Sequence, residues 1–207
     1  MGNFVEILKY SKDLINSDSV QTMATIMGLT GYSFRDFKGI FNLIKFNQKF
    51  EKEFPEGLKE EEQNKILSDC FIELEDYIKE NKNFDDHVFE KIMALLINGL
   101  KKEDILTREY IKILKELSWL ELDVFIEIMK EQKIKTTYAS PGRSQLIADV
   151  ITTIKKKGCI YPKELIKKSI EKLISLFLLC EPINNLTGEI LIKTSLGEEL
   201  NTRLNNN

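Results

Sequence analysis

The stretch LISLFLLCEPINNLTGEILIKTSLGEEL, residues 173–200, constrains the fold of this chain more than any other part of the sequence. A helical apolar pattern ends in it, and two short apolar runs follow that predict strands over about Leu179–Ile183 and Glu189–Thr194. Between them, Asn184–Gly188 supplies residues that tolerate positive φ, which is typical of a hairpin turn. Ser195 and Glu198 then have the spacing of a capping box, which predicts the start of the last helix.

The elements predicted before this hairpin are mostly helical. Ser118 and Glu121 form another capping-box pattern, so a helix should begin at Trp119. A loop over Lys133–Arg143 follows, and then two helices, over Ser144–Lys157 and Pro162–Leu178. Three helices followed by a two-stranded hairpin are the element order of a winged helix, a variant of the helix-turn-helix that is common in DNA-binding proteins.

Nearly all of the sequence before Lys133 has helical periodicity. The clearest helices cover Glu60–Glu80, where apolar residues recur every three or four positions, and Asp85–Leu100. The polar segment after the second of these helices could join two units. We therefore predict a mainly α protein, with an N-terminal helical bundle over residues 1–102. A winged-helix-like unit with a two-stranded β-hairpin should follow over residues 103–207.

The composition favours a soluble chain in a reducing cytoplasm. Of the 207 residues, 43% are hydrophobic and 30% are charged, which suffices for a core without disulfides or structural metals. The three cysteines lie far apart, and no pair has the spacing of zinc ligands. Charges begin early and the longest apolar run is short, so neither a signal peptide nor a membrane span is expected.

Basic residues are concentrated near the C-terminus, although the net charge is −3. Residues 137–207 hold 10 Lys and Arg against 7 Asp and Glu, whereas residues 1–136 hold 20 against 26.

Seven lysines are candidates for contacts to nucleic acid: Lys155, Lys156, Lys157, Lys163, Lys167, Lys168 and Lys172. The predicted helix Pro162–Leu178 lacks the Arg, Asn and Gln that usually contact base edges, and the hairpin turn has no cation. These lysines predict weak, salt-sensitive and sequence-independent binding at most. The other interpretation of these lysines is an ordinary solvent-exposed helix face, on which Glu164 and Lys168 form an i,i+4 ion pair.

The predicted helix over Phe34–Phe54 is unusually rich in phenylalanine. Its rings form two stripes that together make an apolar face wider than one packing neighbour needs. Three interpretations remain: a central helix packed between others, an interface with a protein partner or second copy, and a face lying on a membrane surface. The residues assigned to a partner interface are Phe34, Phe37, Phe41, Phe46 and Phe50.

Patterns for catalysis or metal binding are weak. The single histidine, His87, is expected in the first turn of a helix capped by Asp85 or Asp86 rather than in a catalytic dyad. Cys159 lies beside the lysine run, which could activate its thiol, but a cysteine at a helix end is the simpler interpretation.

Four carboxylates share one side of a predicted helix: Asp69, Glu73, Asp76 and Glu80. Binding of a divalent cation by these carboxylates is one interpretation of their spacing. The other is ordinary salt pairs, which the neighbouring Lys65 and Lys79 favour. We therefore predict no catalytic residue, no metal and no cofactor.

Parts of the C-terminal half also resemble a known family. Residues 107–121 (TREYIKILKELSWLE), residues 169–178 (SIEKLISLFL) and the TSLG segment at 194–197 resemble the Abi-alpha (abortive infection alpha-like) family of bacterial proteins. The resemblance covers roughly residues 105–204. This sequence departs from the family pattern at Trp119, Glu121 and Phe177, where Pro, Asp and Gly are usual. The resemblance implies a role in conflict between bacteria and phages and brings no catalytic residue.

These observations favour a non-enzymatic protein-interaction module in phage–bacterium conflict. It would be either an abortive-infection component or a phage-encoded inhibitor of a host defence system. The alternative is a winged-helix nucleic-acid-binding regulator with weak, sequence-independent phosphate contacts, and an enzyme with dispersed carboxylates ranks last. A protein is the expected partner, while a homodimer, weak nucleic-acid binding and peripheral membrane contact remain open.

Overall fold

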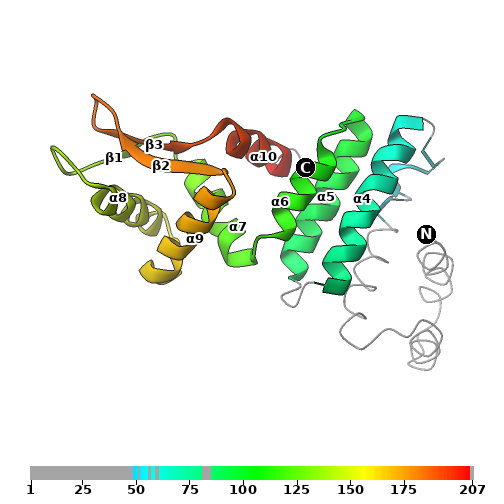
Figure 1. Ribbon diagram of the computed structural model, residues 1–207, viewed down its shortest axis with the longest axis horizontal. Coiled ribbons are helices and arrows are strands. Elements are labelled where there is room, and N and C mark those ends of the chain that lie inside the picture. Colours follow the sequence, from blue (N-terminus) through cyan, green and yellow to red (C-terminus); the bar gives the residue numbers. More distant parts are fainter. Residues whose placement is uncertain (1–48, 51, 56, 59–60, 81–84, 206–207) are drawn as a thin grey trace, which may run out of the picture. The chain divides into compact units, whose positions relative to one another are not determined.

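The computed structural model describes residues 49–50, 52–55, 57–58, 61–80 and 85–205 (Figure 1). This part of the chain is mainly helical, as predicted, and contains a small antiparallel sheet. Contacts divide the chain into two compact units, Met1–Ile111 and Lys112–Asn207. The division falls inside helix α6 (Thr107–Lys115), whereas the predicted boundary after residue 102 lies in the turn before that helix.

In the first unit, helices α4 (Glu61–Glu80) and α5 (Asp86–Lys102) pack side by side (Figure 1). Asp85 caps α5 as predicted, since its side chain accepts hydrogen bonds from the backbone N–H groups of His87 at 2.9 Å and Val88 at 3.3 Å. The largest fully buried side chains among the described residues of this unit come from α4, α5 and α6: Leu74, Phe89, Ile92, Leu96, Leu100 and Ile111.

Helices α5 and α6 approach each other closely where a glycine faces a threonine. A Cβ atom on Gly99 would lie only 2.0 Å from the Oγ1 atom of Thr107, whose side chain is fully buried. The Thr107 hydroxyl has no hydrogen-bond partner within the described residues. The absence of a side chain at residue 99 is therefore what allows this helix contact.

The second unit has the element order helix, strand, two helices, hairpin and helix. Its elements are α7 (Trp119–Lys130), β1 (Ile134–Lys135), α8 (Arg143–Lys156), α9 (Lys163–Ser175), β2 (Leu179–Asn184), β3 (Glu189–Lys193) and α10 (Ser195–Asn205). The first capping box is confirmed, because the Glu121 N–H bonds to the Ser118 hydroxyl at 3.3 Å and the Ser118 N–H bonds to the Glu121 carboxylate at 2.8 Å.

The predicted β2–β3 hairpin is confirmed, and a third strand joins it inside the region predicted as a loop. Strand β1 pairs with β3, so the antiparallel order is β1-β3-β2 with β2 at one edge. Helices α8 and α9 contact the same side of this sheet (Figure 1). Ile190 and Ile192 alternate toward this buried side, and Leu191 between them is exposed.

The second predicted capping box, at Ser195 and Glu198, is wrong by one residue. Thr194 caps α10 instead, because its Oγ1 atom accepts a hydrogen bond from the Gly197 N–H at 3.0 Å. Tertiary contacts favour Thr194 as the cap, because its hydroxyl also bonds the carbonyl oxygens of Phe177 at 2.7 Å and Leu178 at 3.0 Å. Residue 197 must be small there, since a Cβ atom on Gly197 would lie 2.1 Å from the carbonyl oxygen of Leu178. The predicted helix over Pro162–Leu178 is also shorter than expected and ends at Ser175.

Candidate functional site

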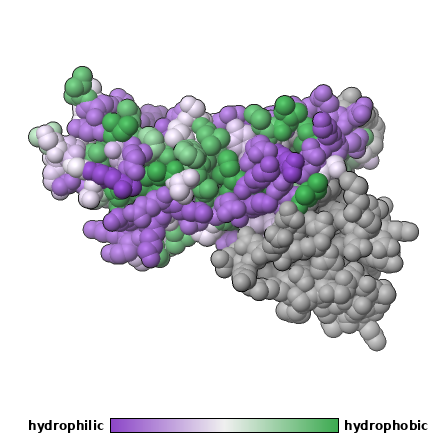
Figure 2. Space-filling view, viewed as in Figure 1, coloured by the Kyte–Doolittle hydropathy of each residue, from purple (hydrophilic) through white to green (hydrophobic). Residues whose placement is uncertain are grey.

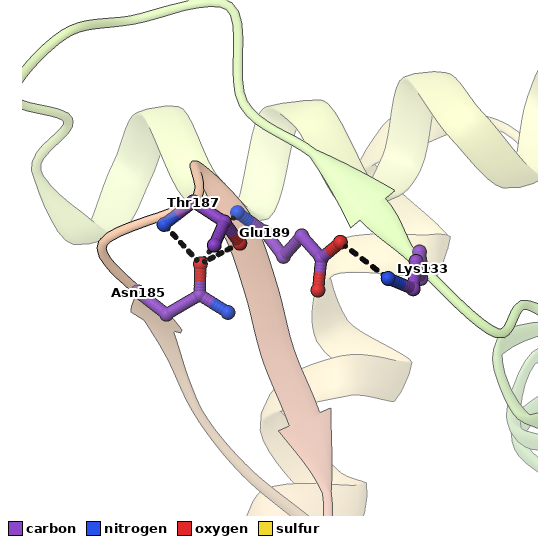
Figure 3. A network of polar contacts seen from close by, with 4 residues as sticks. All are labelled: Lys133, Asn185, Thr187 and Glu189. Atoms are coloured by element: carbon purple, nitrogen blue, oxygen red, sulfur yellow. Dashed lines mark hydrogen bonds and ion pairs between the residues drawn. The ribbon is translucent and has the colours of Figure 1, made fainter.

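The tip of the β2–β3 hairpin is closed by hydrogen bonds, three of which go to one side-chain oxygen. Asn185 Oδ1 accepts hydrogen bonds from the Glu189 N–H at 2.8 Å, the Thr187 N–H at 3.0 Å and the Thr187 hydroxyl at 2.7 Å (Figure 3). The backbone adds a bond from Gly188 N–H to Asn185 O at 3.0 Å, and Gly188 has a φ of 75° that favours glycine. The turn is thus closed by hydrogen bonds within the chain.

Three apolar side chains of this hairpin face solvent. Ile183 and Leu191 are direct partners in the β2–β3 ladder and are 54% and 53% exposed. Leu186, at the ordered tip, is completely exposed. Figure 2 shows hydrophobic residues at the hairpin tip and along the strands behind it. We call Ile183, Leu186 and Leu191 the hairpin patch.

Each charged side chain of the hairpin has a partner within the chain. The Lys133 ammonium lies 2.7 Å from the Glu189 carboxylate (Figure 3), and this hydrogen bond lowers the pKa of Glu189. Glu181 pairs with Arg143, and the Lys193 ammonium donates to the backbone carbonyl of Met129 at 2.8 Å. Since Lys193 is the one cation in residues 179–193, the hairpin offers no free positive charge to a phosphate.

Helix α9 has an exposed strip with carboxylates at its centre. Ile166, Ser169, Ile170 and Leu173 are buried, so the 100° rotation per residue places Glu164, Lys168 and Glu171 opposite them. Lys163 and Lys167 lie along one edge of this strip, and Lys172 lies along the other. The predicted pair between Glu164 and Lys168 is not among the ion pairs of the described residues. The exposed face of α9 thus carries four lysines and two carboxylates, and the carboxylates lie near its centre.

Of the three consecutive lysines predicted for nucleic acid, Lys155 is bonded inside the unit, whereas Lys156 and Lys157 are exposed. The half-buried Lys155 donates its ammonium to the Tyr161 carbonyl at 2.9 Å and the Cys159 carbonyl at 3.4 Å, which closes the turn between α8 and α9. Lys157 lies 3.9 Å from the Glu131 carboxylate. Lys156 is exposed.

Phe177 combines a strained backbone with an exposed ring. Helix α9 ends in a Schellman motif, in which the Leu178 N–H bonds to Leu173 O and the Phe177 N–H bonds to Ile174 O, both at 3.0 Å. That motif puts Phe177 at a φ of 57°, in the left-handed region that favours glycine, and its side chain is 76% exposed. The tight helix end therefore survives without the usual glycine.

Two of the residues considered for catalysis or metal binding, Glu73 and Cys159, have structural surroundings that explain them. Glu73 is buried and accepts hydrogen bonds from Arg108 Nε at 3.0 Å and Nη2 at 2.9 Å, so this carboxylate is already neutralised. The lysine near Cys159 contacts its carbonyl oxygen and not its sulfur. His87 is exposed in the first turn of α5, as predicted.

Neither a metal site nor a reactive buried thiol emerges from the part of the chain that the structure describes. There, no three His, Cys, Asp or Glu side chains gather as metal ligands would, and the side chains of Asp76 and Glu80 lie outside the description. Burial raises the pKa of the Cys70 thiol to about 12. Among these helices, none has the length and apolar character that crossing a bilayer requires.

The Phe-rich face lies mostly outside the described residues. This is the case for Phe34, Phe37, Phe41 and Phe46, whose assignment to a partner interface stays a prediction. Phe50 is half-buried, and its ring centre lies 5.0 Å from that of Phe54.

Sequence reasoning missed the residues that now define the candidate site, namely the hairpin patch and Phe177. One signal was available, because Leu186 is a large apolar residue inside an otherwise polar turn. Comparison with known protein families, with curated proteins and with solved structures gives no match to this chain. The function must therefore be argued from the geometry of the site.

Proposed function

We propose that this chain is a non-enzymatic protein-interaction module whose second unit is a winged helix. The element order from α7 to β3 and the central position of β3 in the sheet support this assignment of the fold. In it, α9 occupies the position of the recognition helix, and the β2–β3 hairpin is the wing.

One observation carries the proposed function: the wing presents apolar side chains on an ordered tip and has all of its own charges paired. Apolar residues such as Leu186 gain free energy when a partner removes them from water. A rigid tip also limits the conformational entropy that binding would cost. Phosphate contacts, in contrast, require accessible cations or backbone donors, and the wing has no free cation.

Phe177 supports the same proposal independently. A non-glycine residue in the left-handed region costs about 1–2 kcal/mol, and an exposed ring gives little packing energy in return. Strained positions of this kind concentrate at functional sites. An aromatic side chain kept there suits an anchor in a protein interface.

A role in phage–bacterium conflict, as an abortive-infection component or an inhibitor of host defence, is part of this proposal and rests on the Abi-alpha resemblance. The alternative, weak sequence-independent binding of nucleic acid, has one favourable observation. Lys163, Lys167 and Lys168 are exposed and have no ion pair within the described residues. The carboxylates of Glu164 and Glu171 between them weigh against it.

Site-specific photo-crosslinking tests the proposal. A photoreactive amino acid replaces Leu186 or Phe177 in the full chain in its host cell, with exposed Lys156 as the matched control position. We expect discrete protein adducts at 186 and 177 and none at 156. Fluorescence anisotropy with a DNA duplex at about 150 mM salt should show no tight binding. Nanomolar binding of DNA together with no protein adduct would overturn the proposal.

A further inference from the structure

We propose that the corner between helices α8 and α9 is a contact site for the surface of a lipid bilayer that contains anionic phospholipids. The site combines two exposed apolar side chains with four exposed lysines: Ile160, Leu165, Lys156, Lys163, Lys167 and Lys168. We call these residues the corner patch. None of them belongs to the hairpin patch, so the inference goes beyond the proposed function and does not depend on it.

Hydrogen bonds from one lysine determine the shape of the corner. The ammonium of Lys155, in the last turn of α8, donates to the carbonyl oxygens of Cys159 and Tyr161. These bonds tie the turn to the end of α8, and α8 and α9 contact each other (Figure 1). Cys159 is buried, whereas Ile160, between the two bonded carbonyls, is 84% exposed. The corner therefore presents an aliphatic side chain to water next to the ends of two helices.

The charge around Ile160 is strongly positive. Residues 155–168 contain six lysines and one carboxylate, that of Glu164. The four lysines of the corner patch have no ion pair within the described residues. A group of unpaired lysines on a surface attracts an anionic partner, and the surface of a bilayer with anionic lipids is one.

The apolar side chains favour a bilayer over a nucleic acid. Phosphate groups offer no apolar region to an aliphatic side chain, and residues 155–168 contain no Arg, Asn or Gln that would contact base edges. The interface of a bilayer attracts lysines to its headgroups and takes up aliphatic side chains just below them. Leu165 is 41% exposed and lies one helical turn before Lys168, so both can reach the same interface as Ile160.

The shape of the corner favours a bilayer over an acidic protein. Ile160 is a single exposed side chain in a turn, and a protein partner would need a pocket that matches it. A bilayer needs no matching shape, because its interface yields to any side chain that enters it.

Flotation of the full chain with vesicles tests the inference. The anionic vesicles contain phosphatidylcholine with about 30% phosphatidylglycerol, and vesicles of phosphatidylcholine alone are the control. We expect the chain to float with the anionic vesicles only. Its partition coefficient should fall by about tenfold or more between about 50 and 500 mM NaCl, because salt screens the lysines. A chain that floats with neither vesicle, or equally with both, overturns the inference.

Variants assign the contact to the corner patch. Ile160→Ser removes the most exposed apolar side chain, and the triple variant Lys163→Gln, Lys167→Gln, Lys168→Gln removes three cations. Each should lower the partition coefficient by about tenfold or more. All four positions are exposed and glutamine is a good helix former, so circular dichroism should show the wild-type fold.

Matched control variants carry the same changes at exposed positions elsewhere. Leu186→Ser removes an apolar side chain from the hairpin, and the triple variant Lys65→Gln, Lys102→Gln, Lys135→Gln lowers the net charge equally. Both should bind the anionic vesicles within about threefold of the wild type, since the local charge decides the contact. Corner variants that bind as well as these controls overturn the inference.

Two further measurements separate a bilayer from other partners. The fluorescence of Ile160→Trp, compared with the wild type, should shift to shorter wavelengths on anionic vesicles, and an unshifted spectrum from a bound chain overturns the inference. Binding of a DNA duplex that requires the three lysines, without flotation on vesicles, overturns it in favour of nucleic acid. Protein adducts at position 186 test the proposed function separately, because Leu186 lies on the hairpin.

Discussion

Asn185 and Glu189 are joined across the turn by a 2.8 Å hydrogen bond from the Glu189 N–H to the Asn185 side-chain oxygen. The same oxygen accepts two hydrogen bonds from Thr187. The Asn185 side chain therefore contributes three of the hydrogen bonds that close the turn in which Leu186 lies.

Asn185→Ala should loosen the tip without changing the hairpin patch. We expect the free energy of unfolding to fall by about 1 kcal/mol, since bonds to one partly exposed oxygen are lost. The amides of Thr187 and Glu189 should exchange hydrogen faster, which NMR can measure. Asn201→Ala removes a bonded asparagine from α10 and is the control, because it should leave both hairpin amides unchanged. Equal protection in both variants would contradict the role assigned to Asn185.

Phe177→Gly should stabilise the second unit. Glycine adopts a φ of 57° without the steric cost that phenylalanine pays, and the lost ring is 76% exposed. We expect a gain of about 1 kcal/mol in urea denaturation. Phe177→Ala keeps the strain and removes the ring, so it should show no gain. A Gly variant less stable than the Ala variant would indicate that the ring makes a packing contribution greater than its exposure implies.

Gly99→Ala should destabilise the first unit by about 2 kcal/mol, because the added Cβ would overlap the buried Thr107 side chain. Adding Thr107→Ala should restore much of the loss, since it removes the overlapping atoms. Thr107→Val alone keeps the shape and deletes a hydroxyl that has no partner in the described residues. Its stability should equal or slightly exceed that of the wild type. Thermal unfolding of the four chains measures these differences.

Because of the ion pair between Lys133 and Glu189, the free energy of unfolding of the second unit should fall in acid. The Lys133 ammonium lowers the pKa of Glu189 below its ordinary value of 4.5, so the folded state favours the ionised carboxylate. The stabilisation is present above pH 4.5 and is lost as the pH falls through the lowered pKa. Glu189→Gln should therefore be less stable than the wild type at pH 7 and equally stable in strong acid.

The control for this pH dependence is Lys133→Met. In that background, Glu189→Gln should change stability much less at pH 7, because the main cause of the pKa shift is gone. High salt should also reduce the difference between wild type and Glu189→Gln, since the pair is exposed. A pH dependence that persists unchanged in the Lys133→Met background would assign it to another carboxylate.

The sequence predicts this fold well wherever the deciding interactions are local. The box of Ser118 and Glu121 spans three residues, and both of its hydrogen bonds are present. Strand β1 escaped prediction because it has two residues and pairs with β3, more than 50 positions later in the chain. The cap of α10 lies at Thr194, one residue before the predicted Ser195, and the Thr194 hydroxyl also bonds the Phe177 and Leu178 carbonyls, which is a contact that the local pattern does not contain.

The candidate site was harder to predict than the fold for a related reason. Seven lysines suggested a basic face, but Lys155 bonds the turn that follows its own helix and is not available at the surface. Alternation along β3 indicates that Leu191 faces away from Ile190 and Ile192, and only the packing of α8 and α9 decides which side is covered. Which face of β3 is exposed therefore depends on tertiary packing and cannot be read from the strand sequence alone.

The Thr194 hydroxyl forms hydrogen bonds at the base of the hairpin, as the Asn185 side chain does at its tip. This hydroxyl lies 2.7 Å from the Phe177 carbonyl and 3.0 Å from the Gly197 N–H, so the segment between residues 177 and 197 leaves and re-enters the helical core at one point. Substitutions at its exposed positions, such as Leu186, should therefore leave the packing of the buried Ile190 and Ile192 against the helices unchanged.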